Sequence, residues 1–369
     1  MKQLDTKQQD IRQPITGSYQ AEDCQFLLSP IEASYTDIAT KERLIQSGQK
    51  HYSEMISYES VPSSTYTELF HALTLKYKAR LAAEILCLSR SISQQKSGLV
   101  TIVSLARAGT PFGALLNRAL KTVYQADSVH YSISIIRDRG IDTNALKYIL
   151  REAKRPASSI IFVDTWTAKG VITNELKQAI YTWNQTEDEY LSDDLYVVSD
   201  IGGTADYAAT YDDYAIPSGI MNATVSGLQS RSILNEQIGT DDFHGSVYYE
   251  HLKAHDLSQW FLDEISEQFS QVKPADQPNI DRETRYQQSQ QWIKHWMKEF
   301  EISDVNHIKP GVAEATRVML RRVPACLILK NSSDPDVAHL RLLAEEKSVP
   351  ILDRPTMPFK AVAFIKALY

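Results

Sequence analysis

The sequence has few cysteines and no long apolar run, and both absences narrow the class of protein. Its three cysteines, Cys24, Cys87 and Cys326, lie far apart in 369 residues and form no CxxC pair. This spacing argues against a disulfide framework or a cysteine zinc site, and it indicates a reducing cytoplasm. No apolar run approaches the roughly 20 residues that span a bilayer. The polar stretch at residues 1–14 lacks the apolar core of a signal peptide, so we expect a cytoplasmic protein without membrane contact.

What is present is typical of a folded protein of about two or three domains. Hydrophobic residues make up 43% of the chain and charged residues 23%, which fits a sizeable core. The net charge of −7 is unevenly spread, since residues 305–369 carry 10 Lys and Arg against 6 Asp and Glu, whereas the rest carries 29 against 40. A basic tail on an acidic body indicates an anionic partner for the tail.

Hydrophobic periodicity divides the chain into four segments. Residues 1–95 are expected to be mostly helical and to pack on the core, because a capping-box pattern at Thr65–Glu68 opens a long Ala/Leu-rich amphipathic run. Residues 96–270 alternate apolar strands with helices, which predicts a mostly parallel sheet with helices on both faces. Residues 271–300 are expected to form a linker and a helix, and 301–369 a small α/β/α domain. The strands expected in the large domain are 99–105, 128–136, 159–165 and 194–201.

Two strand ends of the large domain carry residues suited to phosphate, and ligands of such sheets bind at the carboxyl ends of strands. After the first strand, the loop at 106–110 opens a helix, where backbone N–H groups favour a phosphate oxygen and Arg107 adds a planar fork. After the third strand, Asp164 is followed by a Thr/Lys/Gly turn rich in donors. An ordinary strand-to-helix turn explains either loop alone equally well. Together they predict a site for a ribose phosphorylated at two positions, formed by Ala106, Arg107, Ala108, Gly109, Thr110, Asp164, Thr165, Thr167, Ala168, Lys169 and Gly170.

Further candidates follow the other strands, and each has a structural alternative. Arg137 and Arg139 come after the second strand and are suited to closing over phosphates, although an exposed charged loop explains them as well. Asp200 ends the fourth strand, where it either contacts a ligand or closes a Gly-Gly turn. Ser226 and Arg231 lie in a stretch that is expected to form a binding loop. Asp164 and Arg107 are the candidates for chemistry, and the sequence shows no set of metal ligands.

A peptidase function would need a cysteine paired with a base. Cys24 is the candidate nucleophile, with His51 or His244 as its base, but no familiar local signature surrounds it. Cys87 and Cys326 lie in apolar segments and are expected in the core. The residues alone therefore favour phosphate chemistry over proteolysis.

The two strand-end segments, VTIVSLARAGTP and IIFVDTWTAKGVI, resemble the pyrophosphate loop and the phosphoribosyl-diphosphate (PRPP) loop of type I phosphoribosyltransferases. More closely, almost the whole chain resembles the StiP family of bacterial tellurium-resistance and stress gene clusters, which is described both as a phosphoribosyltransferase and as a cysteine protease. Residues 307–324 resemble part of a PELOTA-type RNA-binding domain. There are two departures. The PRPP loop usually carries two adjacent acids, and here Val163 stands in place of the first; Lys169 stands in the turn where a small residue is common.

The resemblance implies a phosphoribosyltransferase-like fold and transfer at ribose C1 in a stress-linked biosynthetic pathway, with Mg²⁺ bound together with the diphosphate. The small-molecule partner would be PRPP or a related phosphoribosyl or nucleotide compound, and a homodimer is left open. Two other functions stay open, a non-catalytic nucleotide- or RNA-binding protein and the cysteine protease of the family name. For the tail the resemblance implies RNA binding, and a helix face at a domain interface is the alternative for the basic residues involved, Lys309, Arg317, Arg321 and Arg322.

Overall fold

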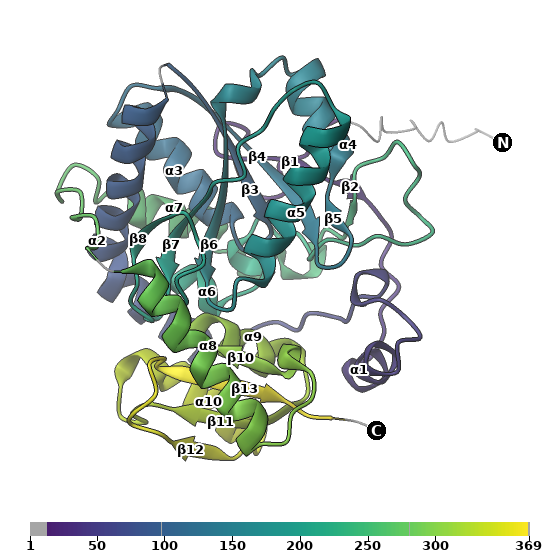
Figure 1. The fold of residues 1–369 in the computed structure, drawn as a ribbon, viewed down its shortest axis with the longest axis vertical. Helices are drawn as coiled ribbons and strands as arrows, with labels where there is room; N and C mark the ends of the chain where they lie inside the picture. The colour runs from purple at the N-terminus through teal and green to yellow at the C-terminus, as the bar shows by residue number, and fades with distance from the viewer. Residues whose placement is uncertain (1–12, 97, 280, 368–369) are drawn as a thin grey trace.

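The computed structural model describes residues 13–96, 98–279 and 281–367, so most of the polar N-terminal stretch discussed above lies outside the described residues. The large domain is built on a seven-stranded sheet (Figure 1). The order of its main path is β1 (Gln25–Leu27), β4 (Asp127–Ile136), β3 (Leu99–Ala106), β6 (Ile160–Thr167), β7 (Leu195–Asp200) and β8 (Tyr207–Thr210). These neighbours all pair in parallel, and the short β5 (Gly140–Ile141) pairs antiparallel with β4.

Helices cover both faces of this sheet. One face packs on α2 (Ser64–Gln95), α3 (Thr110–Thr122) and α7 (Ser258–Ser266), and the other on α4 (Thr143–Lys147) and α5 (Val171–Thr186). Side chains alternate along the strands, so that in β3 Ile102 joins one apolar cluster and Val103 the other. The predicted α/β fold class, with a mostly parallel sheet between two helical layers, is confirmed.

The predicted strands agree with the structure to within two residues, whereas the helix caps differ. Helix α2 begins earlier than the capping-box pattern indicated, because the Ser63 hydroxyl accepts the N–H of Tyr66 at 3.3 Å. At the start of α3, Gly109 occupies the cap position and Thr110 is the first helical residue. The segment before residue 95, expected to be mostly helical, also contributes β1 to the edge of the large sheet.

The small domain is a three-layer α/β/α module, as predicted. Its mixed sheet has the order β10 (Ile308–Pro310), β13 (Ala361–Ile365), β11 (Pro324–Leu329) and β12 (Ile351–Asp353). One face packs on α9 (Val312–Arg321) and α10 (Ala338–Glu346), and the other on α8 (Arg282–Glu299). Helix α8 lies within residues 271–300, which were expected to form a linker and a helix.

Helix α9 docks the small domain on the large one. Its apolar residues belong to the same core cluster as α2 and α3, and it packs on α6 (Pro217–Ile220) of the large domain. The buried carboxylate of Asp213, in the large domain, accepts the N–H of Val312 at 2.9 Å and that of Lys360 at 2.7 Å. These bonds hold the start of α9 near the carboxyl end of the large sheet.

Helix α1 (Ile38–Gln46) lies beside the small domain although it is far from it in the sequence (Figure 1). Its Glu42 is fully buried and accepts two hydrogen bonds from Arg322, at 2.5 and 2.6 Å. The other short elements are the parallel pair β2 (Ser29–Pro30) and β9 (Gly245–Ser246) and the helical turns Tyr52–Glu54, Tyr148–Glu152, Ala157–Ser159, Ala223–Val225, Glu250–His255, Val305–His307 and Pro335–Val337.

Candidate functional site

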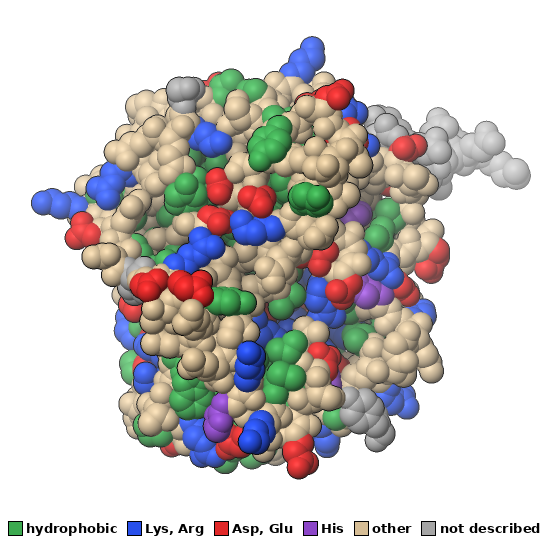
Figure 2. All heavy atoms as spheres, in the orientation of Figure 1, with side chains coloured by type: hydrophobic (Ala, Val, Ile, Leu, Met, Phe, Trp, Pro, Cys, Tyr) green, Lys and Arg blue, Asp and Glu red, His purple; other side chains and the backbone are tan. Residues whose placement is uncertain are grey.

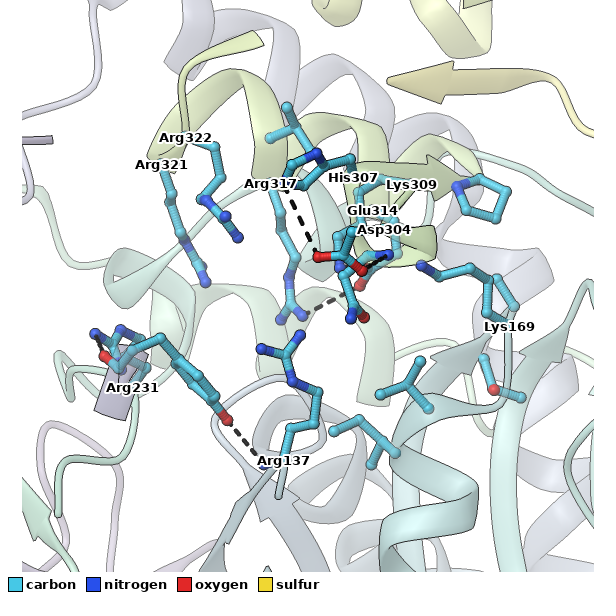
Figure 3. Close-up of a pocket in the computed structure, with 18 of the residues that line it drawn as sticks. Arg137, Lys169, Arg231, Asp304, His307, Lys309, Glu314, Arg317, Arg321 and Arg322 are labelled. Carbon is cyan, nitrogen blue, oxygen red and sulfur yellow. Dashed lines mark hydrogen bonds and ion pairs between the residues drawn. The ribbon is translucent and has the colours of Figure 1, made fainter. Parts of the chain in front are cut away.

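A cavity of about 580 Å³ lies between the carboxyl end of the large sheet and the small domain. The turn between β6 and α5 lines it on one side, α9 and β10 on the opposite side, and α1 at one end. Figure 3 shows basic side chains converging on it from both domains, and Figure 2 shows Lys and Arg side chains gathered along the boundary between them. The topology of the sheet thus places this first cavity where parallel sheets bind their ligands.

The β6–α5 turn supplies an acid to the first cavity. Asp164 is buried, and its carboxylate accepts the N–H of Thr165 at 2.7 Å. Burial raises the pKa of Asp164 to about 7, even though the nearby charge of Arg317 lowers it. The carboxyl group is therefore close to half ionised at neutral pH, and it can hold or release a proton there.

The same turn supplies hydrogen-bond donors. The Thr167 hydroxyl lies 2.7 Å from the hydroxyl of Thr204. Gly170 has a φ of +78°, and a Cβ there would lie 2.9 Å from Thr204 Cγ2, so only glycine fits without strain. Helix α5 then begins at Val171 with no side-chain cap hydrogen bond. Free N–H groups at the start of a helix of this length attract an anion.

Lys169 connects the turn to the small domain. Its ammonium donates to the carbonyl oxygen of Val305 at 2.7 Å, and burial together with the charge of Lys309 lowers its pKa to about 7. Glu314 on α9 offsets part of the positive charge, because its carboxylate lies 4.0 Å from Lys309 Nζ and 3.5 Å from Arg317 Nη1. With a pKa of about 7, part of Lys169 is a neutral amine at neutral pH, and this amine can take up a proton when an anion binds beside it.

Two arginines of the large domain, Arg137 and Arg231, also line the first cavity. The guanidinium carbons of Arg137 and Arg231 lie 5.2 and 5.3 Å from the ring centre of Tyr52. Arg231 donates to the carbonyl oxygens of Tyr52 and Met55, and burial lowers its pKa to about 10. Arg137 also pairs with the exposed carboxylate of Asp138 at 3.0 Å, whereas within the described residues the hydrogen bonds of Arg231 all go to carbonyl oxygens.

Helix α1 adds Lys41, which is 7% exposed. Within the described part of the chain its ammonium has neither a hydrogen bond nor an ion pair, and burial and the charges of Arg231, Arg322 and Arg321 lower its pKa to about 7. The bidentate pair between Glu42 and Arg322 fixes α1 on the small domain, and thereby keeps Lys41 at the cavity.

The first cavity carries an excess of positive charge, with eight lysines and arginines against three carboxylates in its lining. The lowered pKa values of Lys41 and Lys169 are what crowded, partly desolvated cations produce. A multiply charged anion would relieve this crowding, and arginines suit phosphate because they donate two parallel hydrogen bonds. The arrangement is therefore suited to an anionic ligand.

The structure brings the substrate residues and the RNA residues predicted from the sequence into one place. Eleven of them line the first cavity: Arg137, Asp164, Thr167, Ala168, Lys169, Gly170, Arg231, Lys309, Arg317, Arg321 and Arg322. The basic residues of the tail thus face the large domain, which is the interface alternative considered above. Their roles in binding stay predictions.

The loop after β3 is placed differently. None of residues 106–110 appears among the described residues that line the first cavity. Ala106 ends β3, Gly109 packs so closely that a Cβ would lie 2.8 Å from the carbonyl oxygen of Val163, and the Thr110 hydroxyl lies 2.7 Å from that of Ser132. The Thr165 hydroxyl donates to the carbonyl oxygen of Ala108 at 2.7 Å, which ties this loop to the end of β6.

Arg107 lies in a second cavity of about 360 Å³, which shares Lys41, Arg231 and Arg321 with the first. Its guanidinium is 2.7 Å from the carbonyl oxygen of Gln229 and 2.9 Å from the carboxylate of Glu59. Arg107 is therefore already paired, and its predicted contact with a phosphate would require that pair to open.

Two other candidates have structural partners, and a third lies away from both cavities. Arg139 pairs with Glu54. The carboxylate of Asp200 accepts backbone N–H groups of residues 202, 204 and 205 at 3.2, 2.9 and 2.8 Å, so it closes its turn. Ser226 is buried and lines neither of the two cavities.

Five titratable residues in the lining of the first cavity were not predicted from the sequence: Lys41, Tyr52, Asp304, His307 and Glu314. Glu314 had a usable signal, because it precedes Arg317 by three positions and shares a helix face with it. Lys41 had none, since nothing in its local sequence connects it with the strand ends.

The three cysteines lie outside both cavities. Cys24 is 1% exposed in the main core, and burial, with a smaller effect of Asp23, raises the pKa of its thiol well above the usual value. Burial also raises the pKa of Cys87, and it raises that of Cys326 to about 11. No described histidine is hydrogen-bonded to any of them; the Nδ1 atoms of His51 and His244 contact Ser53 and Ser134 instead.

The described residues include no cluster of three or more His, Cys, Asp or Glu that could hold a metal ion. Mg²⁺ is commonly bound by one or two carboxylates together with the phosphates of a substrate, and Asp164 in the first cavity fits that role. Across the described ranges no helix is long and apolar enough to cross a membrane.

Fold and site together define an α/β protein whose cationic cavity is shared by a large and a small domain. The family described as "Tellurite-like stress resistance cysteine protease StiP" matches residues 17–266, and the "PELOTA RNA binding domain" family matches residues 287–367. The "Cysteine protease StiP" of Acinetobacter baylyi is 39% identical over 372 residues, which cover 97% of this chain and 96% of that protein. The chain belongs to the StiP family, and its C-terminal part matches the PELOTA RNA-binding domain.

The family predicted from the sequence is thus confirmed, including the PELOTA match. The names that these comparisons carry are those of a cysteine protease and an RNA-binding domain, and phosphoribosyl transfer is not among them. The expectation of phosphoribosyl chemistry rests on the residues of the site.

Proposed function

We propose that this chain binds a phosphorylated ribose or nucleotide compound in the first cavity and acts at ribose C1. The observation that carries the proposal is that the β6–α5 turn and α9 surround one cavity with an acid, hydrogen-bond donors and eight Lys and Arg side chains. The cavity volume of about 580 Å³ falls within the usual range for small-molecule sites.

In this arrangement a terminal phosphate lies at the start of α5. The helix N–H groups, the Thr167 hydroxyl and Lys169 donate to its oxygens. Asp164 accepts hydrogen bonds from a ribose hydroxyl or holds Mg²⁺ together with the phosphates of the ligand, and the ion would supply positive charge at the diphosphate. Arg317 and Arg321 approach the ligand from the small domain.

The chemistry of such a site is mainly electrostatic. Fixed cations stabilise the departing diphosphate while positive charge develops on the ribose. Because Val163 stands where a second acid is usual, one ribose hydroxyl would lack a carboxylate partner. We therefore expect the site to distinguish poorly between ribose and 2′-deoxyribose compounds.

RNA binding is a second candidate, supported by the PELOTA match at residues 287–367. The four basic residues that the sequence suggested for RNA line the first cavity. A nucleotide at the end of an RNA chain would therefore reach them more readily than a continuous backbone, and RNA would use the same phosphate contacts as a small ligand.

Cysteine peptidase activity is a third candidate, supported by the names of the family and of the Acinetobacter baylyi relative. The nucleophile of such an enzyme is a thiolate, which usually lies beside a base or another positive charge and is partly accessible. Cys24 would have to leave the core to meet these conditions. If the purified protein cleaves peptides and Cys24→Ala abolishes the cleavage without unfolding the chain, the peptidase takes precedence over the phosphoribosyl proposal.

The direct test of the main proposal is a thermal-shift titration with PRPP, ribose 5-phosphate and nucleoside monophosphates, each with and without Mg²⁺. A ligand at about 100 times its dissociation constant stabilises the folded state by roughly 2.7 kcal/mol, or about 3–4 °C for a chain of 369 residues. Lys169→Met should remove most of the shift, whereas the matched control Lys294→Met changes an exposed lysine of α8 and should keep it. No shift with any of these compounds at millimolar concentration would refute the proposal.

A further inference from the structure

The second cavity, of about 360 Å³, plays no part in the function proposed above. It joins the first cavity at Lys41, Arg231 and Arg321, which line both and are called the junction here. Away from the junction, apolar and aromatic side chains form much of its wall, among them Ile38, Ile56, Tyr66, Met221, Tyr249 and Leu320.

Among the described residues, the three cations of the junction form no ion pair with a carboxylate. Within the described residues the Lys41 ammonium makes no hydrogen bond or ion pair although the residue is 93% buried, as its exposed fraction of 7% implies. Arg231 donates to backbone carbonyl groups only. Arg321 donates to the amide oxygen of Asn222, and its Nε–H is buried without a partner.

An acid in the wall of the second cavity offsets the charge of Arg321 only in part, because it already has hydrogen-bond partners. Glu59 lines the second cavity, but one of its oxygens accepts from Arg107 at 2.9 Å and the other from the N–H of Ala223 at 2.7 Å. Buried charges without partners are costly, and a chain keeps them where a ligand supplies the opposite charge. The junction therefore requires an anionic group, and the apolar wall beyond it suits a ring.

We propose that the second cavity binds an aromatic acid, with its anionic group, a carboxylate or a phosphate ester, at the junction and its ring against the apolar wall. The aromatic acid would be the second reactant of the proposed transfer. Only this role depends on the proposed function; the binding of the acid does not. In a transfer at ribose C1, the bond from C1 to the diphosphate oxygen breaks and its electron pair leaves with the diphosphate. A lone pair of the acid forms the new bond to C1, and any proton on the attacking atom passes to solvent.

The test is calorimetric titration of the full chain with benzoate, phenyl phosphate and the neutral benzamide, repeated in saturating ribose 5-phosphate. We expect both acids to bind at least about tenfold more tightly than benzamide, because a hydrogen bond to a charged group is worth roughly 1.5–3 kcal/mol. The tighter of the two acids identifies the group that the junction prefers. The acids should still bind when ribose 5-phosphate occupies the first cavity. Equal affinity for benzamide, or displacement of the acids by ribose 5-phosphate, would overturn the proposal.

Lys41→Met separates a binding role from a structural one. It keeps the length of the side chain and removes an unpaired charge, so the ligand-free variant should melt at the same temperature as the native chain or higher. Its affinity for benzoate should fall by a factor of about 10 to 100, whereas its weak affinity for benzamide should not change. The control Lys294→Met removes an exposed lysine of α8 that lines neither cavity, and should cost less than about threefold.

A Lys41→Met protein that melts lower yet binds benzoate as the native chain does would show that Lys41 is structural and the junction is not an acid site. If this variant fails to fold, Lys41→Gln serves the same comparison. Failure of ribose 5-phosphate to bind would remove the proposed function and leave the acid site standing. Failure of both acids in a protein that does bind ribose 5-phosphate would remove this inference alone.

Discussion

The lowered pKa of Lys169 allows the pH dependence of ligand affinity to be predicted quantitatively. Burial and the charge of Lys309 lower this pKa from 10.5 to about 7 in the ligand-free protein. A phosphate beside the ammonium would favour its charged form and return the pKa toward its ordinary value. Binding would then take up a proton at alkaline pH, so the affinity for a phosphorylated ligand must fall as the pH rises above 7.

The size of the effect follows from the fraction of lysine that carries its proton. With a pKa of about 7, about half of the Lys169 side chains carry the proton at pH 7 and only about 1% at pH 9. The affinity should therefore drop roughly fiftyfold over this range, and by more if Lys41 responds in the same way. Ligand titration adds little, because a phosphate monoester loses its second proton near pH 6.

The assay is calorimetric titration of the full chain with ribose 5-phosphate at pH 7, 8 and 9, without metal ion. Asp164 also titrates near pH 7, but its ionisation is nearly complete at pH 8, so the fall between pH 8 and 9 belongs to the lysines. Lys169→Arg keeps its charge over the whole range and should flatten the pH profile while it preserves binding. An affinity of the native chain that stays constant between pH 7 and 9, or that rises, would refute the reasoning.

Three further predictions concern the elements that hold the site together. Arg322→Met removes the arginine partner of the fully buried Glu42. The free energy of unfolding in urea should fall by about 3–5 kcal/mol, and adding Glu42→Gln should restore part of it. Asp213→Ala leaves the N–H groups of Val312 and Lys360 without their acceptor, so the free energy of unfolding should fall by about 2–4 kcal/mol and ribose 5-phosphate should bind more weakly. For the control Asp212→Ala, which changes a side chain that is 69% exposed, the loss should be less than about 1 kcal/mol. In the ligand-free protein, the pKa of Lys169 is lower in the folded than in the unfolded state, so the unfolded chain binds more protons between about pH 7 and 10.5. The free energy of unfolding should therefore rise with pH in this window. Lys169→Met should make that rise shallower, as measured by urea unfolding at pH 7 and 9.

The large sheet could be predicted from the sequence because its strands are continuous apolar runs separated by helical segments. The run at 159–165 became β6 almost unchanged, since a strand buried on both faces leaves a strong local signal. The acid and the turn at its end followed directly from the topology of parallel sheets. Caps were less predictable, because Ser63 and Thr65 offer similar local chemistry and only packing decides between them.

The composition of the site was only half predictable. The residues of the β6–α5 turn are contiguous, and their donors can be recognised in the sequence. Lys41 and Tyr52, in contrast, come from segments that precede the large sheet, and they reach the cavity through a tertiary ion pair and a ring contact. For Arg107 the loop chemistry suggests a phosphate contact, which stays a prediction, and nothing in the sequence indicated that a distant acid, Glu59, would pair with it.

The uneven charge of the chain has a different meaning once the structure is known. The excess of Lys and Arg after residue 305 suggested a tail that binds an external polyanion, and four contacts with single-stranded RNA would make log affinity fall with log salt at a slope of about −3. Lys309, Arg317, Arg321 and Arg322, however, face a cavity shared with the large domain. A cavity of about 580 Å³ has room for one nucleotide rather than for a strand. We therefore expect the full chain to bind short RNA with a slope nearer −1, and Arg321→Ala to weaken RNA and ribose 5-phosphate in parallel. A slope near −3, with ribose 5-phosphate unable to compete, would mean that RNA binds an outer surface and that the tail acts independently of the cavity.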